Sequence, residues 1–538
     1  MSVMRAAVVI TTLVVIATWP FVLTLPTHVS DFGDPLLNSW ALTWVARALV
    51  TAPSAVFDAN IFFPEATTLT YSEPMLVPAL LVGPILWAGG DPILAHNVLV
   101  LIGYAGSGVT MFLLVRSLTG HGGAALVAGV MFALYPYRAE AFAKVQMQMT
   151  MFWPLALWCL HRMARSPATG LPWRWATGCG LALAAQAYSG VYVFAYGLVT
   201  MAIVAAVLIV RVERERRGRV VAGAAVAVLV AGVLVLPLAR AFVQSSARVG
   251  ERTLDSTRPY SAEMRDFRRA HPELRVWGDE GAPGPSERRL FPGYVTLTVG
   301  AAGAVLGGPA GLAYAAAGIV DVLLARGANT NAFEWLFNHV GPMRAFRVPA
   351  RFGLLLGLSL SILSGLAVAR LLKGRAPAVT AAVVAVIVAG VTVEGWMRPP
   401  IVTSPGESRP AVYEWLAGQM RGAVCEYPIG QIHGRPGPQD PTYMYYSTRH
   451  WMPLVNGYSG FTPASYEALV GELQAFPAPS AILALRHRQV RYLLVHERYY
   501  LRGSFDEDVA RLRDTPGLRW VQTFTWQDGT RSDAFVLM

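Results

Sequence analysis

The sequence predicts a polytopic α-helical membrane protein with about 11 spans, a juxtamembrane or re-entrant helix, and a C-terminal soluble α/β domain. The 538-residue chain is 54% hydrophobic and only 14% charged, and its mean hydropathy is +0.43. Several apolar runs reach the roughly 20 residues that a helix needs to cross a bilayer, most clearly 6–25 and 220–239. After residue 400 these runs give way to short strand-like and amphipathic segments.

The net charge of +11 follows the same pattern. Most basic residues lie in short loops between apolar runs, as the positive-inside rule describes, so we interpret the charge as a topology signal and expect no nucleic-acid partner. The three cysteines, Cys159, Cys179 and Cys425, show neither the spacing of a zinc site nor a disulfide framework.

Four short basic loops determine the predicted topology. They contain Arg116, Arg162 to Arg174, Arg211 to Arg219, and Arg370 to Arg375. If these loops and the N-terminus are all cytoplasmic, each interval between them holds an even number of crossings. The interval before Arg116 holds three apolar segments, 6–25, 74–90 and 94–115. We predict that 74–90, which prolines interrupt, stays on the outer side.

The other intervals complete eleven predicted crossings. Besides 6–25 and 94–115, these are 122–137, 149–161, 175–188, 191–210, 220–240, 293–307, 309–325, 352–369 and 377–396. This arrangement predicts a multi-pass protein of the bacterial cytoplasmic membrane with its N-terminus inside and its C-terminus outside.

Two domains follow from this topology. The membrane domain covers 1–399, and its predicted outer loops are 27–73, 135–148, 242–291 and 329–351. The outer domain covers 400–538. Within it, 422–429 and 490–496 have the pattern of strands, and 465–476 has that of a helix.

The stretch "DFGDPLLNSWALTW" (31–44) places two carboxylates, Asp31 and Asp34, at a membrane exit. An Asp followed by Pro at a helix start is a favourable capping arrangement, which does not exclude a chemical role for Asp34. The same loop carries further acids among aromatic residues, and we expect it to form the rim of a site. These candidates are Asp58, Glu65, Tyr71 and Glu73.

Cations gather on the same predicted face. Arg138 and Lys144 lie in "YPYRAEAFAKVQ", and Arg347 and Arg351 lie in "RAFRVPAR", just before a span. One interpretation is that these side chains extend to lipid phosphates at the membrane surface. The other is that they form a functional site, because ionisable groups at membrane depth are costly. The planar guanidinium of Arg is suited to binding phosphate. Further candidates for the cavity are Tyr137, Gln146, Gln148, Tyr188 and Tyr192.

The segment "STRHWMPLVNGYSGF" (447–461) is the densest polar-aromatic run of the outer domain. One interpretation is a turn-rich core segment. The other is a surface that meets an acceptor, because aromatic rings and polar side chains suit sugar faces and hydroxyls. The candidates are His450, Trp451, Asn456 and Tyr458.

These features fit one chemistry. An outward carboxylate can take a proton from an acceptor hydroxyl, and an Arg or Lys can stabilise a phosphate leaving group. A slot in the membrane can hold a lipid tail. Together they suit glycosyl transfer from a polyprenyl-phosphate sugar to an acceptor.

The chain resembles the GT-C class of glycosyltransferases, which includes protein mannosyltransferases, aminoarabinose transferases and oligosaccharyltransferases. More closely, it resembles a group of poorly characterised bacterial GT-C-like membrane proteins. The segments that carry the resemblance are "GDPLLNSWALTW", "FDANIFFPE", "LTYSE", "YPYRAEAFAKVQMQ", "LFPGY", "FRVPARFG" and "HWMPLVNGYSGF".

The resemblance implies roles for particular residues. By position, Asp34 matches the catalytic acid of the first loop, with Asp31 as the other candidate. We therefore expect inverting transfer of a monosaccharide to a glycan, lipid or protein acceptor in the cell envelope. The metal-site motif of oligosaccharyltransferases is not evident, and the sequence identifies no metal ligand and leaves a divalent metal open.

Two other functions remain as alternatives. A transporter of lipid or polysaccharide usually has ionisable groups near the bilayer midplane and often paired repeats. Here the predicted spans are nearly free of charged residues, with Asp321 as the exception. No repeat is visible in the sequence. A catalytically silent scaffold for envelope assembly is the second alternative.

Overall fold

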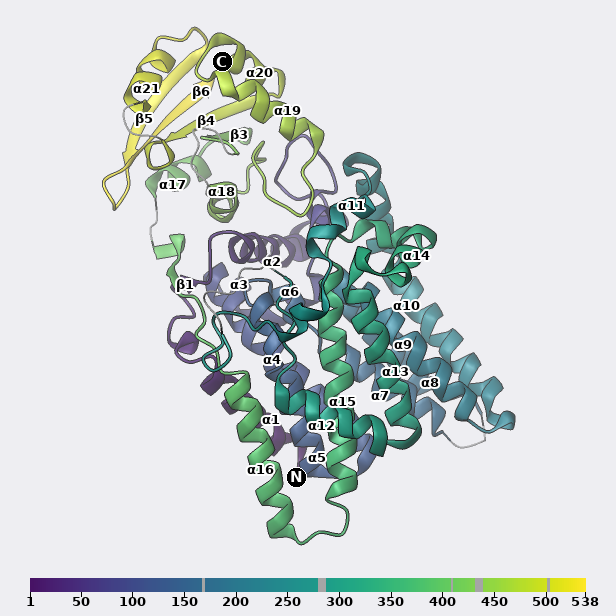
Figure 1. Ribbon diagram of the computed structural model, residues 1–538. Coiled ribbons are helices and arrows are strands. Elements are labelled where there is room, and N and C mark those ends of the chain that lie inside the picture. The colour runs from purple at the N-terminus through teal and green to yellow at the C-terminus, as the bar shows by residue number, and fades with distance from the viewer. Residues whose placement is uncertain (167–169, 279–286, 408–409, 431–438, 501–503) are drawn as a thin grey trace. The chain divides into compact units, whose positions relative to one another are not determined.

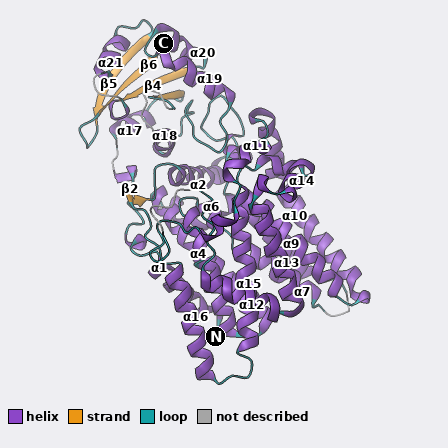
Figure 2. Ribbon diagram, viewed as in Figure 1, coloured by secondary structure: helices purple, strands orange, loops and turns teal. Residues whose placement is uncertain are grey.

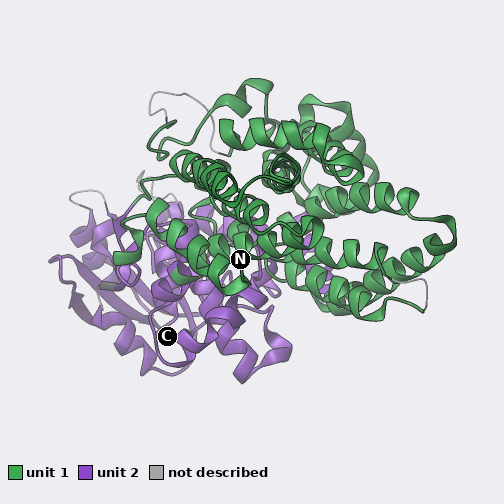
Figure 3. Ribbon diagram, turned by 90° about the horizontal axis from the view of Figure 1, so that it is seen from below, with its two compact units in different colours: residues 1–24, 98–238, 251–400 green, residues 25–97, 239–250, 401–538 purple. Residues whose placement is uncertain are grey.

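The computed structural model describes residues 1–166, 170–278, 287–407, 410–430, 439–500 and 504–538 (Figure 1). The chain divides into two compact units, each built from three segments (Figure 3). Unit 1 comprises residues 1–24, 98–238 and 251–400, and unit 2 comprises 25–97, 239–250 and 401–538. Both units therefore combine segments that lie far apart in the sequence.

Long apolar helices dominate the chain. The described residues contain six that are long and apolar enough to cross a membrane. They are α4 (Pro92–Thr119), α9 (Val191–Arg211), α10 (Arg214–Val249), α13 (Gly308–Ala325), the stretch Pro349–Leu371 that includes α15 (Gly353–Leu371), and α16 (Pro377–Glu394). They confirm a polytopic helical membrane protein.

The other predicted crossings fall on helices of 12 to 15 residues. These are α1 (Val3–Ala17), α5 (Gly122–Ala133), α7 (Phe152–Ala164), α8 (Trp173–Ala187) and α12 (Tyr294–Leu306). Because a span needs about 20 residues, the total of eleven crossings stays a prediction.

Helix α15 is the central helix of unit 1. Its residues from Gly353 to Val368 are all buried, and it packs against α5, α12 and α13. Small residues allow this close approach. A Cβ at Gly303 of α12 would lie only 2.0 Å from the carbonyl oxygen of Leu363, so only glycine fits there.

Short helices connect the long ones in unit 1. The segment 135–148 forms a 3-10 helix over Pro136–Ala141 and α6 (Val145–Gln148). The segment after α13 contains α14 (Asn331–His339) and a 3-10 helix over Pro349–Phe352. The expected polar loop at 242–291 begins too early, because α10 continues through Pro237 to Val249. A proline can kink a helix without ending it.

Unit 2 begins with α2 (Asp34–Thr51) and α3 (Leu76–Trp87). Helix α2 starts at Asp34 with Pro35 next to it, as the sequence predicts, but Gly33 is the residue at the N-cap. Before α2, the strand β1 (His28–Val29) pairs antiparallel with β2 (Val402–Thr403).

The C-terminal part of unit 2 contains a four-stranded mixed sheet (Figure 2). The strands β3 (Ala423–Tyr427), β4 (Val490–His496), β5 (Leu518–Thr525) and β6 (Arg531–Leu537) have the order β3-β4-β6-β5. β3 and β4 are parallel and the other pairs are antiparallel. The chain passes from β3 to β4 through α18 (Gln439–Ser447), α19 (Ala464–Glu472) and α20 (Pro479–His487), and α21 (Phe505–Arg513) precedes β5. The predicted strands at 422–429 and 490–496 and the helix at 465–476 are confirmed.

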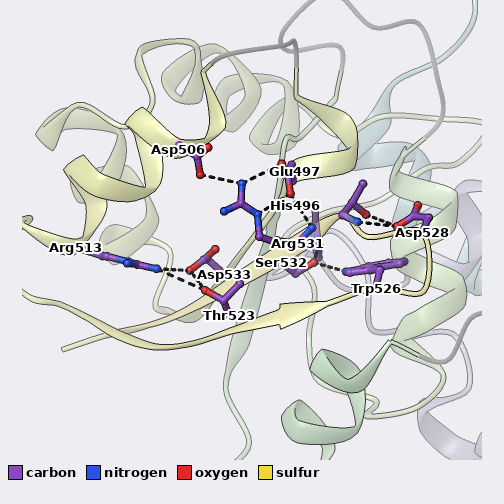
Figure 4. Close-up of polar contacts among 11 residues, drawn as sticks. His496, Glu497, Asp506, Arg513, Thr523, Trp526, Asp528, Arg531, Ser532 and Asp533 are labelled. Carbon is purple, nitrogen blue, oxygen red and sulfur yellow. Dashed lines mark hydrogen bonds and ion pairs between the residues drawn. The ribbon is translucent and has the colours of Figure 1, made fainter.

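Polar side chains on β6 stabilise this sheet (Figure 4). Ser532 is fully buried, and its hydroxyl oxygen accepts from Trp526 Nε1 at 2.6 Å and lies 2.7 Å from His496 Nδ1. The preceding residue, Arg531, points to the other face of the strand. Its guanidinium donates to both carboxylate oxygens of Glu497, at 2.9 and 3.0 Å. The network thus anchors β6 on both faces.

The first loop of unit 2 forms backbone hydrogen bonds with a segment beside this sheet. Phe62 N donates to the carbonyl oxygen of Asn456 at 3.0 Å, and Leu454 N donates to that of Asn60 at 2.7 Å. The segment around Leu454 is in turn bridged in parallel to Val424 of β3. The loop 57–73 is therefore held by backbone hydrogen bonds to the C-terminal part of the chain.

Candidate functional site

The turn before α2 holds the two predicted catalytic acids. Asp31 is exposed, and its Oδ1 accepts from Gly33 N at 2.7 Å. Asp34 is half-buried in the first turn of α2, where an acidic side chain stabilises a helix through the helix dipole. A Cβ built on Gly33 would lie 3.1 Å from Asp31 Oδ1 and 3.7 Å from Tyr458 Oη. This turn therefore brings Asp31, Asp34 and Tyr458 together.

Two other acids of the first loop, Asp58 and Glu65, accept hydrogen bonds from other residues of the protein. Asp58 Oδ1 accepts from Thr67 N at 2.8 Å, and Glu65 Oε1 accepts from Ser465 Oγ at 2.6 Å. Glu73 is buried, with 7% of its surface exposed. Because Asp58 and Glu65 fix the course of the loop, we assign them to its structure rather than to chemistry.

A cation that the sequence analysis missed lies beside this loop. Arg248, near the end of α10, donates through Nη1 to the carbonyl oxygen of Ala66 at 2.7 Å. It also acts on Tyr71, which is 1% exposed. Burial and the charge of Glu65 raise the pKa of the Tyr71 hydroxyl, and Arg248 opposes this increase. The sequence places Arg248 in the predicted outer loop 242–291 among many other arginines, and nothing in the local pattern indicates its contact with the loop 57–73.

The aromatic residues of 447–461 contact α2. The rings of Trp451 and Trp44 lie 5.7 Å apart, and the Arg47 guanidinium lies 5.2 Å from the Trp451 ring centre. Such an arrangement is a cation–π contact. Trp451 also adopts a left-handed backbone conformation, with φ of 55°.

His450 and Asn456 belong to the core instead. Burial lowers the pKa of His450 to about 3, so its ring is neutral, and its Nδ1 accepts from Met452 N at 3.0 Å. Asn456 is fully buried. Its Oδ1 accepts from Glu426 N at 2.8 Å, and its Nδ2 donates to the carbonyl oxygen of Glu426 at 2.9 Å and to Asp440 Oδ1 at 3.0 Å. These contacts favour the turn-rich core interpretation for both residues, and we do not carry them into the proposed site.

In unit 1 an acid and two predicted cations form one cluster. The Glu287 carboxylate accepts hydrogen bonds from Arg351 Nε at 2.8 Å and from Arg351 Nη2 at 2.6 Å. Lys144 Nζ lies 3.3 Å from Glu287 Oε1. Arg351 and Lys144 come from segments more than 200 residues apart in the sequence. Tyr137 also joins the cluster, because its hydroxyl donates to the carbonyl oxygen of Glu287 at 3.2 Å.

The charges of this cluster are strongly coupled. Burial alone would raise the pKa of Glu287, but Arg351 and Lys144 lower it to about 2. Glu140 accepts from Glu287 N at 2.5 Å and pairs with Arg289 at 3.4 Å. Burial still raises the pKa of the Glu140 carboxyl.

Further cations adjoin this cluster. The Arg347 guanidinium lies 5.0 Å from the ring centre of Tyr260, and its backbone N donates to Tyr192 Oη at 3.0 Å. Arg351 lies 4.4 Å from the ring centre of Tyr192. Burial and the charge of Arg347 lower the pKa of Arg252.

Positive charge is therefore in excess around these segments. Among the described residues, the group holds five basic side chains, Lys144, Arg252, Arg289, Arg347 and Arg351, and two acidic ones, Glu140 and Glu287. Arg347 forms no ion pair with any residue that the structure describes. An excess of guanidinium groups suits a phosphate.

Arg138 has a different environment from Arg351. It is 1% exposed, and its guanidinium donates to the carbonyl oxygen of Phe132, to Gln148 Oε1 and to Thr150 Oγ1 at 2.6 to 3.1 Å. Gln148 is fully buried and returns a bond to the carbonyl oxygen of Arg138 at 3.1 Å. We therefore assign Arg138 and Gln148 to the internal support of segment 132–150.

The remaining predicted cavity residues have other surroundings. Gln146 is 6% exposed. Tyr188 is half-buried and donates through its hydroxyl to the carbonyl oxygen of Leu234 in α10 at 2.9 Å. In the part of the chain that the structure describes, no group of three His, Cys, Asp or Glu side chains is arranged to hold a metal ion.

No protein-family model matches the chain, and no curated protein matches it in sequence. Solved structures do share its fold. The arabinofuranosyltransferase AftD from Mycobacteria matches with a TM-score of 0.61 and 16% identity, over 99% of this chain and 40% of the AftD chain. The chain thus spans less than half of AftD.

ArnT from Cupriavidus metallidurans matches over 99% of this chain and 98% of its own, with a TM-score of 0.52 and 14% identity. The structure of the same ArnT bound to undecaprenyl phosphate matches equally well, at 13% identity. Together with the long apolar helices, these likenesses show that this chain is a polytopic membrane protein with the fold of GT-C glycosyltransferases.

Proposed function

We propose that the protein transfers a monosaccharide from a polyprenyl-phosphate-linked donor to an acceptor at the outer face of the cytoplasmic membrane. The observation that carries this proposal is the excess of positive charge around Lys144, Arg347 and Arg351 in unit 1. A lipid-linked phosphate that leaves during transfer is an anion, and cations that face it stabilise its developing charge. The fold shared with ArnT, one structure of which holds undecaprenyl phosphate, supports the same donor class.

Asp34 is the proposed general base, and Asp31 is the other candidate. The Asp34 carboxylate takes the proton of the acceptor hydroxyl while the acceptor oxygen bonds to the anomeric carbon. The bond between that carbon and the phosphate oxygen breaks, and polyprenyl phosphate leaves. A single displacement of this kind inverts the anomeric configuration. Tyr458, whose hydroxyl lies close to the same turn, is the proposed acceptor-side residue.

The proposed function requires a particular topology. Segment 135–148, the segments before α12 and α15, and residues 400–538 all belong outside, with α3 as a juxtamembrane helix. Helix α3 has 12 residues, which extend about 18 Å at 1.5 Å per residue. That is shorter than the roughly 30 Å of a bilayer's hydrocarbon core.

Asp321 does not support the alternative that the protein is a transporter. This residue is fully buried in α13, and its oxygens face Thr200 Oγ1 at 2.8 Å and Ser359 Oγ at 3.5 Å. A lone acid between two hydroxyls is an internal polar contact rather than a chain of ionisable groups.

Substitution of the proposed base tests the function. We expect Asp34→Asn to lower the transfer rate by about 10²- to 10⁴-fold, because the amide keeps the shape but cannot accept the proton. The assay uses purified full-length protein, undecaprenyl-phosphate-linked pentoses and hexoses, and cell-envelope acceptors. Asp31→Asn is the matched control, because an Asn oxygen can still accept from Gly33 N.

The control also separates the two candidate bases. Full activity in Asp34→Asn together with loss in Asp31→Asn would transfer the role to Asp31. Full activity in both variants would reject a base in this turn. Binding of undecaprenyl phosphate without turnover of any donor would instead favour the scaffold.

A further inference from the structure

Unit 1 contains a large cavity at one end of its helices. Its volume is about 1170 Å³, slightly above the roughly 300–1,000 Å³ of typical ligand pockets. The walls come from the α4–α5 turn, the C-terminal ends of α7 and α9, the α12–α13 turn and the α15–α16 turn. All four basic loops that the sequence places on the cytoplasmic side are adjacent to or contribute to this cavity.

The lining of this cavity is strongly basic. It includes Arg165, Arg211, Arg370, Lys373 and Arg375, and none of the described residues that line it is Asp or Glu. All five side chains are exposed, and none of them forms an ion pair with a described residue. Arg165 donates to the carbonyl oxygen of Ser117 at 3.0 Å, which fixes it at the wall. Like charges gathered without acids repel one another, and a bound anion relieves that repulsion.

The cavity also has an apolar side. Leu126, Leu208, Leu366 and Val384 line it from four different helices. A soluble anion would gain nothing from these side chains. An amphiphile with an anionic head and hydrocarbon chains can contact both parts of the lining at once.

The position of the cavity separates it from the proposed donor site. Arg351 precedes α15, and Arg370 lies near its C-terminal end. The 19 residues of α15 extend about 28 Å, close to the thickness of a bilayer's hydrocarbon core. The two groups of cations therefore lie at opposite ends of the same buried helix.

We propose that this cavity binds the phosphate headgroup of an anionic phospholipid, with its acyl chains along the apolar wall. The guanidinium groups supply planar, paired donors for phosphate oxygens. Basic pockets between membrane helices on the cytoplasmic side are suited to such headgroups, because that leaflet is rich in anionic lipid. The site is independent of glycosyl transfer and of Asp34.

Native mass spectrometry of the full-length protein in detergent tests this proposal. The protein is mixed with phosphatidylglycerol or with phosphatidylcholine that has the same acyl chains. The test variant is Arg370→Gln with Arg375→Gln. The control is Arg5→Gln with Arg214→Gln, which removes two exposed positive charges that do not line the cavity.

We expect the wild type and the control to retain one phosphatidylglycerol molecule in preference to phosphatidylcholine. The test variant should retain it about tenfold or more weakly, since each basic residue contributes substantially to binding an anionic headgroup. A thermal unfolding midpoint equal to that of the wild type without added lipid establishes that the test variant is folded.

Two results would overturn the proposal. One is equal retention of phosphatidylglycerol by the test and control variants. The other is complete displacement of phosphatidylglycerol by millimolar inorganic phosphate, which would identify a site for soluble anions. If the test variant does not fold, Lys373→Gln replaces it, with Arg214→Gln alone as the control and with a smaller but measurable loss of retention expected.

Discussion

Glu287 shows how one buried residue determines the properties of its surroundings. It adopts a left-handed conformation, with φ of 74°, that a glutamate rarely takes. Its carboxylate contacts Arg351 and Lys144, while its backbone N donates to Glu140. Nothing in the local sequence around residue 287 predicts these partners, because each of them comes from another segment of the chain.

Replacement of Glu287 should destabilise the protein. We expect Glu287→Gln to cost about 3 kcal/mol, because Arg351 would keep a buried charge without its counter-ion. The midpoint of thermal unfolding in detergent at pH 7 should fall by several degrees. Glu334→Gln, at an exposed position in the first turn of α14, is the control and should lower the midpoint much less, because it removes only an exposed helix-dipole contact of less than about 1 kcal/mol.

The same carboxyl predicts a pH dependence. Its pKa of about 2 lies below the ordinary value of 4.5, so the unfolded chain binds more protons than the folded protein. This contribution to stability is therefore complete above about pH 4.5 and is lost as the pH falls toward 2. A wild type and a Glu287→Gln variant that lose stability in parallel over this window would contradict the assignment.

At the scale of elements, the loop 57–73 depends on Asn60. Its Oδ1 accepts from Trp40 Nε1 at 3.0 Å, and its Nδ2 donates to Ser447 Oγ at 3.2 Å and to the carbonyl oxygen of Met452 at 3.0 Å. The side chain is 6% exposed. One amide thus joins α2, α18 and the segment that borders β3.

Asn60→Ala should release this loop. The change leaves Trp40 Nε1 buried without its acceptor, at a cost of about 1–3 kcal/mol. Hydrogen exchange measured by mass spectrometry should accelerate in peptides covering 58–64 and 451–456. Asn338→Ala, at an exposed position of α14, is the control. Unchanged exchange in both peptides would show that the backbone bonds hold the loop alone.

Local patterns predict an element well where its own residues decide it. The start of α2 at Asp34 follows from the Asp-Pro pair, and the strands β3 and β4 follow from their short apolar runs. The predicted span ended at residue 240, nine residues before the end of α10, because the apolar run stops at Arg240 while the helix continues through polar residues to Val249. Hydropathy marks where an apolar run ends, and a helix can continue beyond that point.

At the scale of the whole molecule, composition and hydropathy predict the membrane class, the resemblance of several segments predicts the GT-C fold, and contacts between distant segments determine the site. Arg138 and Arg351 look alike in sequence, since each adjoins an apolar run. In the structure, the Arg138 guanidinium donates to backbone and amide oxygens. Arg351 instead pairs with Glu287 in a group where basic side chains outnumber acidic ones. Such differences depend on long-range contacts, which a single sequence does not contain.

The topology is the prediction on which the proposed function depends, and cysteine labelling tests it. The three native cysteines are buried, so their background reaction is low. We expect Ala88→Cys, at the exposed C-terminal end of α3, to react with an impermeant maleimide on intact cells. Ser117→Cys and Lys373→Cys should react only after the cells are opened. Their loops carry arginines whose transfer across a membrane costs about 2.5–3.5 kcal/mol each at the bilayer centre. Protection at residue 88 together with labelling at 117 would mean that α3 crosses the membrane, and the outer placement of Lys144, Arg347 and Arg351 would then fail.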